Sequence, residues 1–479
     1  MSDQEQQLRI LEISGQKMNE NTRFEKDILG EVEIPSDVYW GISTQRAIND
    51  FKISGKKFPD SFIIALAQIK KACLQTNLEL KLMNQNLGQA LEQSIDEIIN
   101  ENKLLDQFPI DIYQTGSGTQ TNMNMNEVLA YRANEILGHE LGKKFPVHPN
   151  DHVNKGQSSN DVIPTTMHLV SIEEIQNFLL PALRKIISVL EDKVEEFKDI
   201  IKVGRTHLQD AVPIPLSLEF LVYQKQLTAE EQKLSDIVEE LKSIPLGGTA
   251  LGTGINTHEE FGELAVQKLS QITEIEFRSN PVKAEGIASH IIFVKLSGNL
   301  KSLSLALLKM ANDIRWMSSG PRAGLGELII PQEEPGSSIM PGKVNPTQAE
   351  MLIQVCLRII GNDTTITFAE GFGSTLDLNV TKPLIISTIL ESVYLLSNGM
   401  ISFTENCLID LKANHPRIQK QLEENLMIVT NLVSEIGYDK AAEIAKEAYE
   451  TGKTIKEIIE EKQIEIENLD EILDPKKMV

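Results

Sequence analysis

The feature that most constrains the fold is a set of long helical patterns in the middle of the chain. Between residues 172 and 197, apolar side chains recur at intervals of three and four, and a seven-residue apolar repeat runs from Phe220 to Leu241. Such spacing places the apolar side chains on one face of a helix, and the seven-residue repeat is typical of helices that pack along their length. Pro181 falls inside the first pattern, where we expect it to kink the helix rather than end it.

Three further helices are expected at about 284–318, 347–360 and 383–410, which makes five long helices in the centre of the chain. The residues before about 155 mix shorter helical patterns with polar loops, and short charged helices follow from about 412. Few alternating strand patterns are found. We therefore predict a mainly α fold around a central five-helix bundle. The apolar faces are wide for one bundle, which favours packing of bundles from several subunits.

Composition narrows the possible partners. The chain has 479 residues and a formal net charge of −23, which disfavours nucleic acid or an anionic membrane as a partner. We find no apolar run of about 18 residues, and therefore expect no membrane span. The polar residues 1–7 resemble neither a secretory signal nor an organellar transit peptide. We therefore expect a cytoplasmic protein.

The three cysteines, Cys73, Cys356 and Cys407, are widely separated and have apolar neighbours. An odd number without a Cys-x-x-Cys pair argues against a disulfide framework or a zinc site, and the spacing matches no iron–sulfur motif. We expect buried free thiols in a reducing compartment, no metal site and no cofactor.

Four polar segments interrupt the helical patterns, and the first covers residues 115–127. Its glycines allow the backbone to approach a ligand closely, and its Ser, Thr and Asn side chains are neutral hydrogen-bond donors. If a helix begins near Thr121, its free N–H groups would favour an anion. A polar loop that merely caps a helix is the alternative.

The second polar segment covers residues 148–161 and contains His148 and His152, which are spaced as metal ligands on a helix are. The Pro-Asn-Asp sequence between them is typical of a turn, so the two rings need not share a face. A loop that contacts an anion is favoured over a metal site, and a simple surface loop is the alternative.

The third segment, residues 204–210, places His207 among hydroxyl, amide and carboxylate neighbours, which suits a general acid or base. A lone histidine is also often structural.

The fourth segment, residues 336–346, reads Gly-Ser-Ser-Ile-Met-Pro-Gly-Lys-Val-Asn-Pro. Its glycines and prolines exclude a helix or strand, and we expect a mobile loop that closes over an anionic ligand. Pro346 suits the first turn of the helix that follows, and an ordinary surface loop is the alternative.

Together, in their order and spacing, these four segments resemble the fumarase/aspartase superfamily, whose signature is Gly-Ser-Ser-x-Met-Pro-x-Lys-x-Asn. The resemblance extends from about Arg23 to the C-terminal end of the chain. Within this superfamily, His207 favours the class II, iron-independent fumarate hydratases, because aspartate ammonia-lyases typically have glutamine there. Gly342, Thr347 and Gln348 favour the same class, because aspartate ammonia-lyases tend to have alanine after the loop proline and apolar residues after Asn-Pro.

The resemblance implies an enzyme that reversibly hydrates fumarate to (S)-malate in the tricarboxylic acid cycle without a cofactor. It implies three domains: a mixed, mostly helical domain over 1–157, a central bundle over 158–411 and a small helical domain over 412–479. It also implies a homotetramer with a twenty-helix core, in which three subunits share each active site.

The resemblance further implies roles for individual residues. Ser337 is the expected base, and Lys343 and nearby N–H groups would stabilise its alkoxide. His207, polarised by Glu350, would position or protonate the departing water. The expected substrate-binding residues are Ser117, Gly118, Thr119, Ser158, Ser159, Asn160, Thr206, Ser338, Lys343 and Asn345. A second dicarboxylate site is expected at His148, Asn150 and Asp151, although the Lys-Lys-Phe sequence at 143–145 departs from the basic pair of some relatives.

Two alternative functions remain open from the sequence. The first is an aspartate ammonia-lyase of the same superfamily, against which His207 and Gly342 count. The second is a non-catalytic structural protein on the same scaffold, comparable to the lens crystallins of this superfamily. A complete set of expected catalytic residues counts against it: Ser337, Lys343, Asn345, His207 and Glu350.

Overall fold

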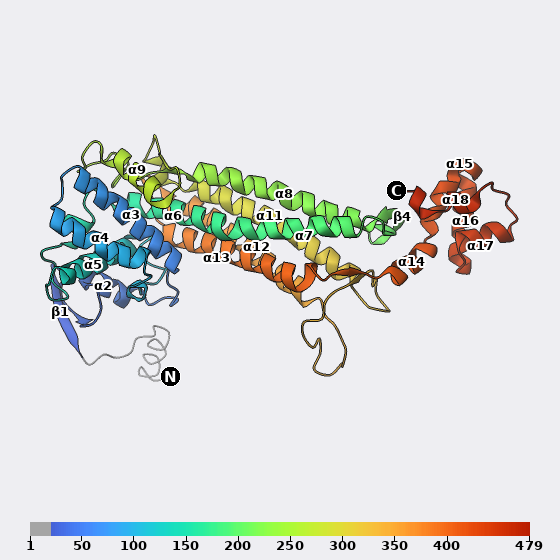
Figure 1. Cartoon of the computed structure of the whole chain (residues 1–479), viewed down its shortest axis with the longest axis horizontal. Coiled ribbons are helices and arrows are strands. Elements are labelled where there is room, and N and C mark those ends of the chain that lie inside the picture. The colour runs from blue at the N-terminus through green and yellow to red at the C-terminus, as the bar shows by residue number, and fades with distance from the viewer. Residues whose placement is uncertain (1–20) are drawn as a thin grey trace. The chain divides into compact units, whose positions relative to one another are not determined.

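The computed structural model describes residues 21–479 (Figure 1). Residues 1–7, from which we expected no targeting sequence, lie outside the described residues. The chain forms two compact units, each assembled from separate stretches of sequence. Unit 1 contains the residues up to Asn177 together with Leu234–Leu300 and Gly361–Tyr394, and unit 2 contains Phe178–Lys233, Lys301–Ile360 and Leu395–Val479.

Unit 1 opens with an antiparallel hairpin and continues mainly as helices, several of which are labelled in Figure 1. Helix α3 packs against α4, α6 and α9, and α4 packs against α5. Its strands are β1 (Thr22–Asp27), β2 (Gly30–Pro35), β5 (Ser243–Ile244), β6 (Arg278–Ser279), β8 (Ser374–Thr375) and β9 (Leu378–Asn379). Its helices are α2 (Ile42–Asp50), α3 (Asp60–Glu79), α4 (Gln85–Ile99), α5 (Thr119–Ile136), α6 (Ser159–Glu174), α9 (Phe261–Thr273) and α10 (Glu285–Ala288), with short turns η1 (Leu105–Gln107) and η2 (Pro149–Val153).

Unit 2 contains a second hairpin and a series of short C-terminal helices. Its strands are β3 (Ile201–Thr206), β4 (Gln209–Pro215), β7 (Leu328–Ile329) and β10 (Lys412–Ala413). Its helices are α7 (Leu180–Glu196), α14 (His415–Glu423), α15 (Val433–Ile436), α16 (Tyr438–Thr451), α17 (Ile455–Glu461) and α18 (Leu469–Ile472), with turns η4 (Thr404–Leu408), η5 (Leu426–Leu432) and η6 (Pro475–Lys477). The described strands pair only in two-stranded sheets, so the expected mainly α fold is confirmed.

Four long helices contribute residues to both units: α8 (Leu216–Leu241), α11 (Ile291–Met317), α12 (Thr347–Gly373) and α13 (Lys382–Phe403). The seven-residue repeat of α8 is buried throughout, since Phe220 and Leu227 lie in the core of unit 2 and Leu234 and Leu241 in that of unit 1. The predicted apolar seam of this helix is therefore confirmed.

Polar contacts join neighbouring long helices within each unit. In unit 2, Arg184 of α7 donates to Glu231 of α8, and Ser402 of α13 donates to Gln348 of α12. In unit 1, Ser297 of α11 donates to Asp363 of α12. These contacts between helices far apart in sequence show bundle packing inside both units.

The predicted helix around Pro181 is interrupted in a specific way. A single π turn, η3 (Ile175–Leu179), joins α6 to α7, and Pro181 lies in the first turn of α7. Proline lacks an N–H group, and the first turn of a helix has no intrahelical acceptor for that group. The wider π turn thus lets the chain remain helical through this point, and the expectation that Pro181 would not end the helix is confirmed.

Two predicted boundaries were wrong. Helix α12 does not end at 360 but continues to Gly373, because polar side chains just beyond that point make tertiary contacts, such as the bond from Asn362 to Ser392. The predicted helix at 284–318 is split between α10 and α11. The break is stabilised by the buried carboxylate of Glu370, which accepts hydrogen bonds from the Ser289 hydroxyl and the backbone N–H of His290.

Two segments, Ile291–Met317 and Lys382–Leu408, are long and apolar enough to cross a membrane by length and composition alone. In the sequence we looked for an uninterrupted run of apolar residues. These two segments have high mean hydropathy although polar residues interrupt them. The core helix of a bundle meets the same criterion, and α13 buries Ile385, Ile389 and Val393 completely. We therefore read both segments as bundle helices.

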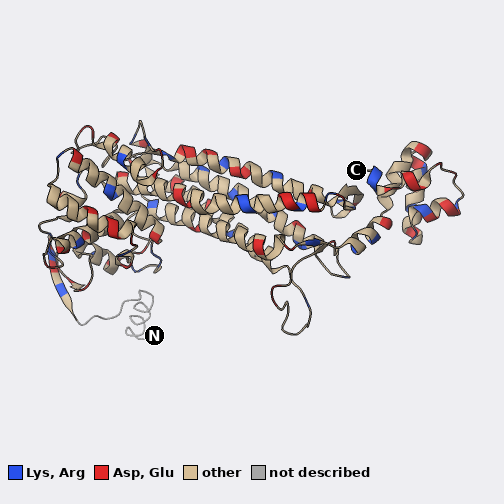
Figure 2. Ribbon diagram, in the orientation of Figure 1, with Lys and Arg blue, Asp and Glu red and all other residues tan. Residues whose placement is uncertain are grey.

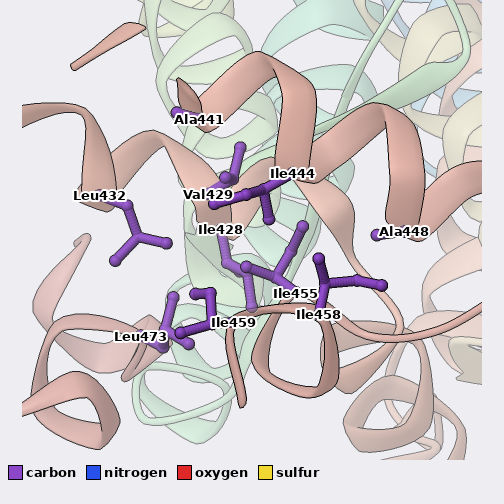
Figure 3. Packing of buried hydrophobic residues seen from close by; sticks show 10 residues of the cluster. All are labelled: Ile428, Val429, Leu432, Ala441, Ile444, Ala448, Ile455, Ile458, Ile459 and Leu473. Carbon is purple, nitrogen blue, oxygen red and sulfur yellow. The ribbon is translucent and has the colours of Figure 1, made fainter. Parts of the chain in front are cut away.

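The C-terminal part of unit 2 has its own apolar core (Figure 3). It is formed by η5, α16, α17 and the residue that follows α18, and α17 begins with a capping box made by Thr454 and Glu457. The buried residues of this cluster are Ile428, Val429, Leu432, Ala441, Ile444, Ala448, Ile455, Ile458, Ile459 and Leu473. The predicted run of short helices after residue 412 is thus confirmed.

All three cysteines are buried free thiols, as expected. Burial raises the pKa of Cys356 and of Cys407 to about 12, so both stay protonated at neutral pH. Acidic and basic residues are interspersed along the helices of both units (Figure 2).

Candidate active site

The first polar segment forms the tight turn that starts α5. Gly118 caps the helix with φ at +74°, a backbone conformation that glycine adopts without strain. A Cβ atom on Gly116 would lie 1.5 Å from the carbonyl oxygen of Val380, so only glycine fits at this position. Helix α5 begins at Thr119, slightly earlier than the expected start near Thr121.

Three hydroxyl groups meet at the start of α5. The hydroxyls of Ser117 and Thr119 are 2.7 Å apart, and those of Thr119 and Ser159 are 2.8 Å apart. Ser117 is buried, whereas Thr119 and Ser159 are half-buried. Each hydroxyl can both donate and accept, so the chain of three can turn its donors toward an anionic oxygen. The first and second polar segments therefore converge within unit 1.

The second polar segment positions its donors through the first turn of α6. Ser158 caps this helix: its hydroxyl accepts from the N–H of Asn160, and its own N–H donates to Asp161 over 2.9 Å. The other Asp161 oxygen accepts two backbone N–H groups from residues 247–249, at 3.1 and 2.9 Å. Burial raises the pKa of Asp161 to about 6 despite these bonds. The Asn160 amide donates to the carbonyl of Ala250 over 2.9 Å.

The two histidines of the second segment cap a π turn, Pro149–Val153. The Nδ1 atom of His148 accepts from the N–H groups of Asn150 and Asp151, both at 3.2 Å, and the Nδ1 atom of His152 accepts from the N–H of His148 at 2.9 Å. The four-residue spacing of the rings thus serves backbone capping. His148, Asn150 and Asp151 lie together in this one turn, in which Asn150 and Asp151 are exposed.

The third segment is the tip of the β3–β4 hairpin in unit 2. His207 and Leu208 occupy the two turn positions with φ at +56° and +60°, as in a type I′ turn. Thr206 and Gln209 pair on either side of the turn. Positive φ at two successive residues other than glycine is uncommon and is often found at functional sites. The hairpin presents Thr206 and His207 as exposed side chains.

The base of this hairpin is fixed by buried charges. Glu327 is fully buried, and its carboxylate lies 2.6 Å from the Arg205 guanidinium and 3.3 Å from the Lys202 ammonium. A buried carboxylate with two cationic neighbours forms a rigid anchor. Because Arg205 is two residues before His207, this anchor fixes the strand that leads into the hairpin tip.

The fourth segment, residues 336–346, lies outside helices and strands, as expected. It is closed by its own hydrogen bonds: the Gly336 N–H donates to the carbonyl of Lys343 over 3.1 Å, and the Asn345 amide donates to the carbonyl of Gly336 over 2.6 Å. Gly342 has φ at +79° inside the loop. The loop is thus a defined ring of backbone, from which the Ser338 and Lys343 side chains extend into solvent.

Two backbone N–H groups point at the hydroxyl of Ser337. They belong to Ile339 and Met340, at 3.3 and 3.1 Å from the Ser337 Oγ atom. Donors in this arrangement stabilise negative charge on the oxygen, which lowers the free energy of its deprotonated form. Glu350 lies in the first turn of α12 with an exposed carboxylate. Within the described chain, no hydrogen bond joins Glu350 to His207.

Comparison with known proteins decides the family. Residues 30–361 match a family model described as "Lyase", and residues 428–479 match one described as "Fumarase C C-terminus". The class II fumarate hydratase of Nitrosomonas europaea is 47% identical over 457 residues, which cover 95% of this chain and 98% of that protein. The chain belongs to the class II fumarate hydratase family.

Two further comparisons agree. A mitochondrial fumarate hydratase of Rhizopus oryzae is 46% identical over 437 residues, which cover 91% of this chain and 88% of that protein. The crystal structure of a class II fumarase from Schistosoma mansoni superposes with a TM-score of 0.92 at 38% identity, covering 96% of this chain and 99% of that one. The resemblance inferred from the four polar segments is therefore confirmed, as is the lyase class.

The sequence did not predict two buried lysines, Lys70 and Lys382, which bond to the segments that precede the hydroxyl cluster of unit 1. Lys70 of α3 donates to Asn154 and Gln157, and the backbone N–H of Lys382 donates to the carbonyl of Gly116 over 3.0 Å. Burial lowers the pKa of both ammonium groups to about 7. The available signal for Lys70 was a charged residue within the apolar stretch Phe62–Cys73.

Proposed function

We propose that this chain hydrates fumarate to (S)-malate reversibly and that the polar segments described above form its active site. The observation that carries the proposal is the meeting of the Thr119 and Ser159 hydroxyls, 2.8 Å apart although 40 positions separate them in sequence. Each belongs to the first turn of a long helix, where free N–H groups and the helix dipole favour an anion. Such a pair of helix starts suits one carboxylate of a dicarboxylate substrate.

Neutral donors are well suited to this chain, whose formal net charge is −23. Salt screens that charge over about 10 Å, so hydrogen bonds of short range can hold a dianion against it. We assign substrate binding to the residues that offer such donors or a local cation: Ser117, Gly118, Thr119, Ser158, Ser159, Asn160, Thr206, Ser338, Lys343 and Asn345.

In the direction from malate, Ser337 is the proposed base. Its alkoxide removes the proton from the carbon beside one carboxylate, and the electron pair moves onto that carboxylate to give an aci-carboxylate. The N–H groups of Ile339 and Met340 support the alkoxide, as their distances of 3.3 and 3.1 Å from the Oγ atom allow. Lys343 and Asn345 are proposed to bind the oxygens on which charge accumulates.

The second half of the reaction breaks the C–O bond. The aci-carboxylate electrons form the double bond of fumarate while the hydroxyl group leaves, and His207 donates the proton that makes the leaving group water. Glu350 is proposed to polarise His207. In the hydration direction the same groups act in reverse, so His207 accepts a proton from water and Ser337 returns one to carbon.

We also propose the homotetramer, with four central bundles forming a twenty-helix core and three subunits sharing each active site. Large apolar side chains are exposed on the central helices. In unit 1, Phe368 and Phe372 of α12 stack with ring centroids 5.9 Å apart and are 59% and 81% exposed. In unit 2, Trp316 of α11 and Leu357 of α12 are about half exposed. Apolar surface of this kind is typical of helices that other subunits cover.

Three further assignments are proposals of the same kind. Buried free thiols suit a reducing compartment, which supports a cytoplasmic location for this chain, although the Rhizopus relative is named mitochondrial. The three-domain division at 157 and 411 stays a prediction. The turn that holds His148, Asn150 and Asp151 together is the proposed second dicarboxylate site.

The assignment of the base is tested by Ser337→Ala, with Val344→Ala as a control in the same loop. We expect Ser337→Ala to lower kcat by at least about 10²-fold with a much smaller change in KM, because the base acts only in the transition state. The side chain of Val344 is 40% exposed and has no assigned role, so its truncation should leave kcat nearly unchanged. A Ser337→Ala enzyme with normal kcat would remove Ser337 from the mechanism.

A further inference from the structure

Four of the lysines that the structure describes are buried, and they differ in their partners. Lys193 lies 2.7 Å from the carboxylate of Glu196, and Lys202 lies 3.2 Å from that of Glu219. Lys70 and Lys382, exposed by 1% and 0%, have no carboxylate within salt-bridge distance in the part of the chain that the structure describes. Burying an ammonium group without such a pairing is costly, so these two positions require another reason.

Lys70 has two neutral partners. Its Nζ atom donates to the side-chain oxygen of Asn154 over 3.1 Å and to that of Gln157 over 2.9 Å. Both acceptors belong to the turn that directly precedes Ser158, the residue that caps α6. The Lys70 amino group has at least two N–H donors in either protonation state, so it can hold both side chains of this turn at once.

The same turn is connected to α5. The side-chain oxygen of Asn154 also accepts from the Asn122 amide over 3.1 Å, and Asn122 lies one helical turn after Thr119. The Asn154 amide in turn donates to the carbonyl of Gln157 over 3.1 Å. Lys70 is thus the point from which hydrogen bonds reach the starts of both helices that carry the hydroxyl cluster.

We propose that Lys70 is a positioning residue for substrate binding: through Asn154 and Gln157 it holds Thr119 and Ser159 at the distance at which both bind one carboxylate. This inference rests on the proposed function of the hydroxyl cluster. Asp161, at the start of α6, is the acidic group whose charge acts on Lys70 from a neighbouring element, and Cys73 is the titratable group on α3 itself.

The test compares Lys70→Met with Lys71→Met in the purified full-length enzyme. Methionine keeps most of the length of the side chain and removes the ammonium group. Lys71 is adjacent on the same helix but pairs with Asp96 over 2.6 Å. We expect Lys70→Met to raise KM for (S)-malate by about tenfold or more while kcat changes less, because the two hydrogen bonds that order the binding groups are lost. Lys71→Met should leave KM unchanged.

A second pair of variants changes Gln157, which accepts a hydrogen bond from Lys70, and leaves the Lys70 side chain in place. Gln157→Met removes the acceptor and should raise KM as Lys70→Met does. Gln157→Glu keeps an acceptor for Lys70 but loses the amide donor to the carbonyl of Val153, at 2.9 Å, so its KM should rise less than that of Gln157→Met. The double variant Lys70→Met/Gln157→Met should raise KM by less than the product of the two single effects, because both changes break the hydrogen bond between Lys70 and Gln157.

Each result decides the inference. A folded Lys70→Met enzyme with unchanged KM overturns it, as does lower kcat at normal KM, which would show a merely structural role. If Lys70→Met fails to fold, a normal KM for Gln157→Met overturns it, as does an equal rise of KM in Gln157→Met and Gln157→Glu, and a larger rise in Gln157→Met supports it. Wild-type enzyme that forms no fumarate from malate overturns the proposed function as well, so the two failures are distinguishable.

Discussion

Replacing Asp161 by asparagine tests how the fold organises the hydroxyl cluster. The Asp161 carboxylate is fully buried and accepts three backbone N–H groups, one from Ser158 and two from residues 247–249, at 2.9 to 3.1 Å. Asparagine keeps one acceptor oxygen and presents an NH₂ group in place of the other. At least one of these buried N–H groups then faces a donor instead of an acceptor.

The magnitude follows from the number of lost acceptors. A buried N–H group without a partner costs about 1–3 kcal/mol, and either one or two groups lose theirs, so Asp161→Asn should lower the free energy of unfolding by roughly 1–6 kcal/mol. Because Ser158 is one of the three donors, the cap of α6 should also loosen, and KM for malate should rise with the loss of stability.

Urea unfolding and steady-state kinetics measure the two effects in one preparation. Asp60→Asn is the matched control, because Asp60 is an exposed acid in the first turn of α3 and its removal changes only surface charge. Surface changes of this kind stay within about 0.5 kcal/mol. If Asp161→Asn unfolds with the same free energy as Asp60→Asn and keeps a normal KM, Asp161 does not organise the site.

Three further predictions concern other parts of the chain. His207→Asn should lower kcat by about 10²-fold or more in the malate assay, and normal turnover would make this exposed histidine structural. Burial lowers the pKa of His168, whose Nδ1 atom is 2.7 Å from the carbonyl of Leu241, to about 4. Since the unfolded chain binds this proton near pH 6.5 and the folded one only near pH 4, acidification through this window should cost about 3 kcal/mol of unfolding free energy. Urea unfolding at several pH values should show that slope, and His168→Gln should reduce it. Gly116→Ala should disrupt the start of α5, because the added Cβ would lie 1.5 Å from the Val380 carbonyl, and an unchanged melting temperature would contradict this.

The sequence predicted the long helices well, because their burial pattern is local. Phe220, Leu227, Leu234 and Leu241 are all buried at the expected spacing. The end of α12 was missed because Asn362, beyond the predicted end, is satisfied by Ser392 of α13, a contact that no local pattern shows. The two-residue turn at His207 was also missed, because neither of its residues is a glycine or asparagine.

The candidate site was predictable only as separate segments. The residues of each loop were recognised by their chemistry, but the contact between Thr119 and Ser159 depends on how α5 and α6 pack. Lys70 was missed for a related reason, since its role depends on two amide side chains more than 80 positions away in sequence. The proposed pairing of His207 with Glu350 stays a prediction.

The most direct test of the proposed function is the formation of fumarate by the purified chain, followed by the ultraviolet absorbance of its double bond. We expect absorbance to rise with (S)-malate as substrate, equally with and without a chelator, and not to rise with aspartate. Fumarate formed from aspartate with release of ammonia, or no fumarate from malate, would contradict the proposal that this chain is a hydratase.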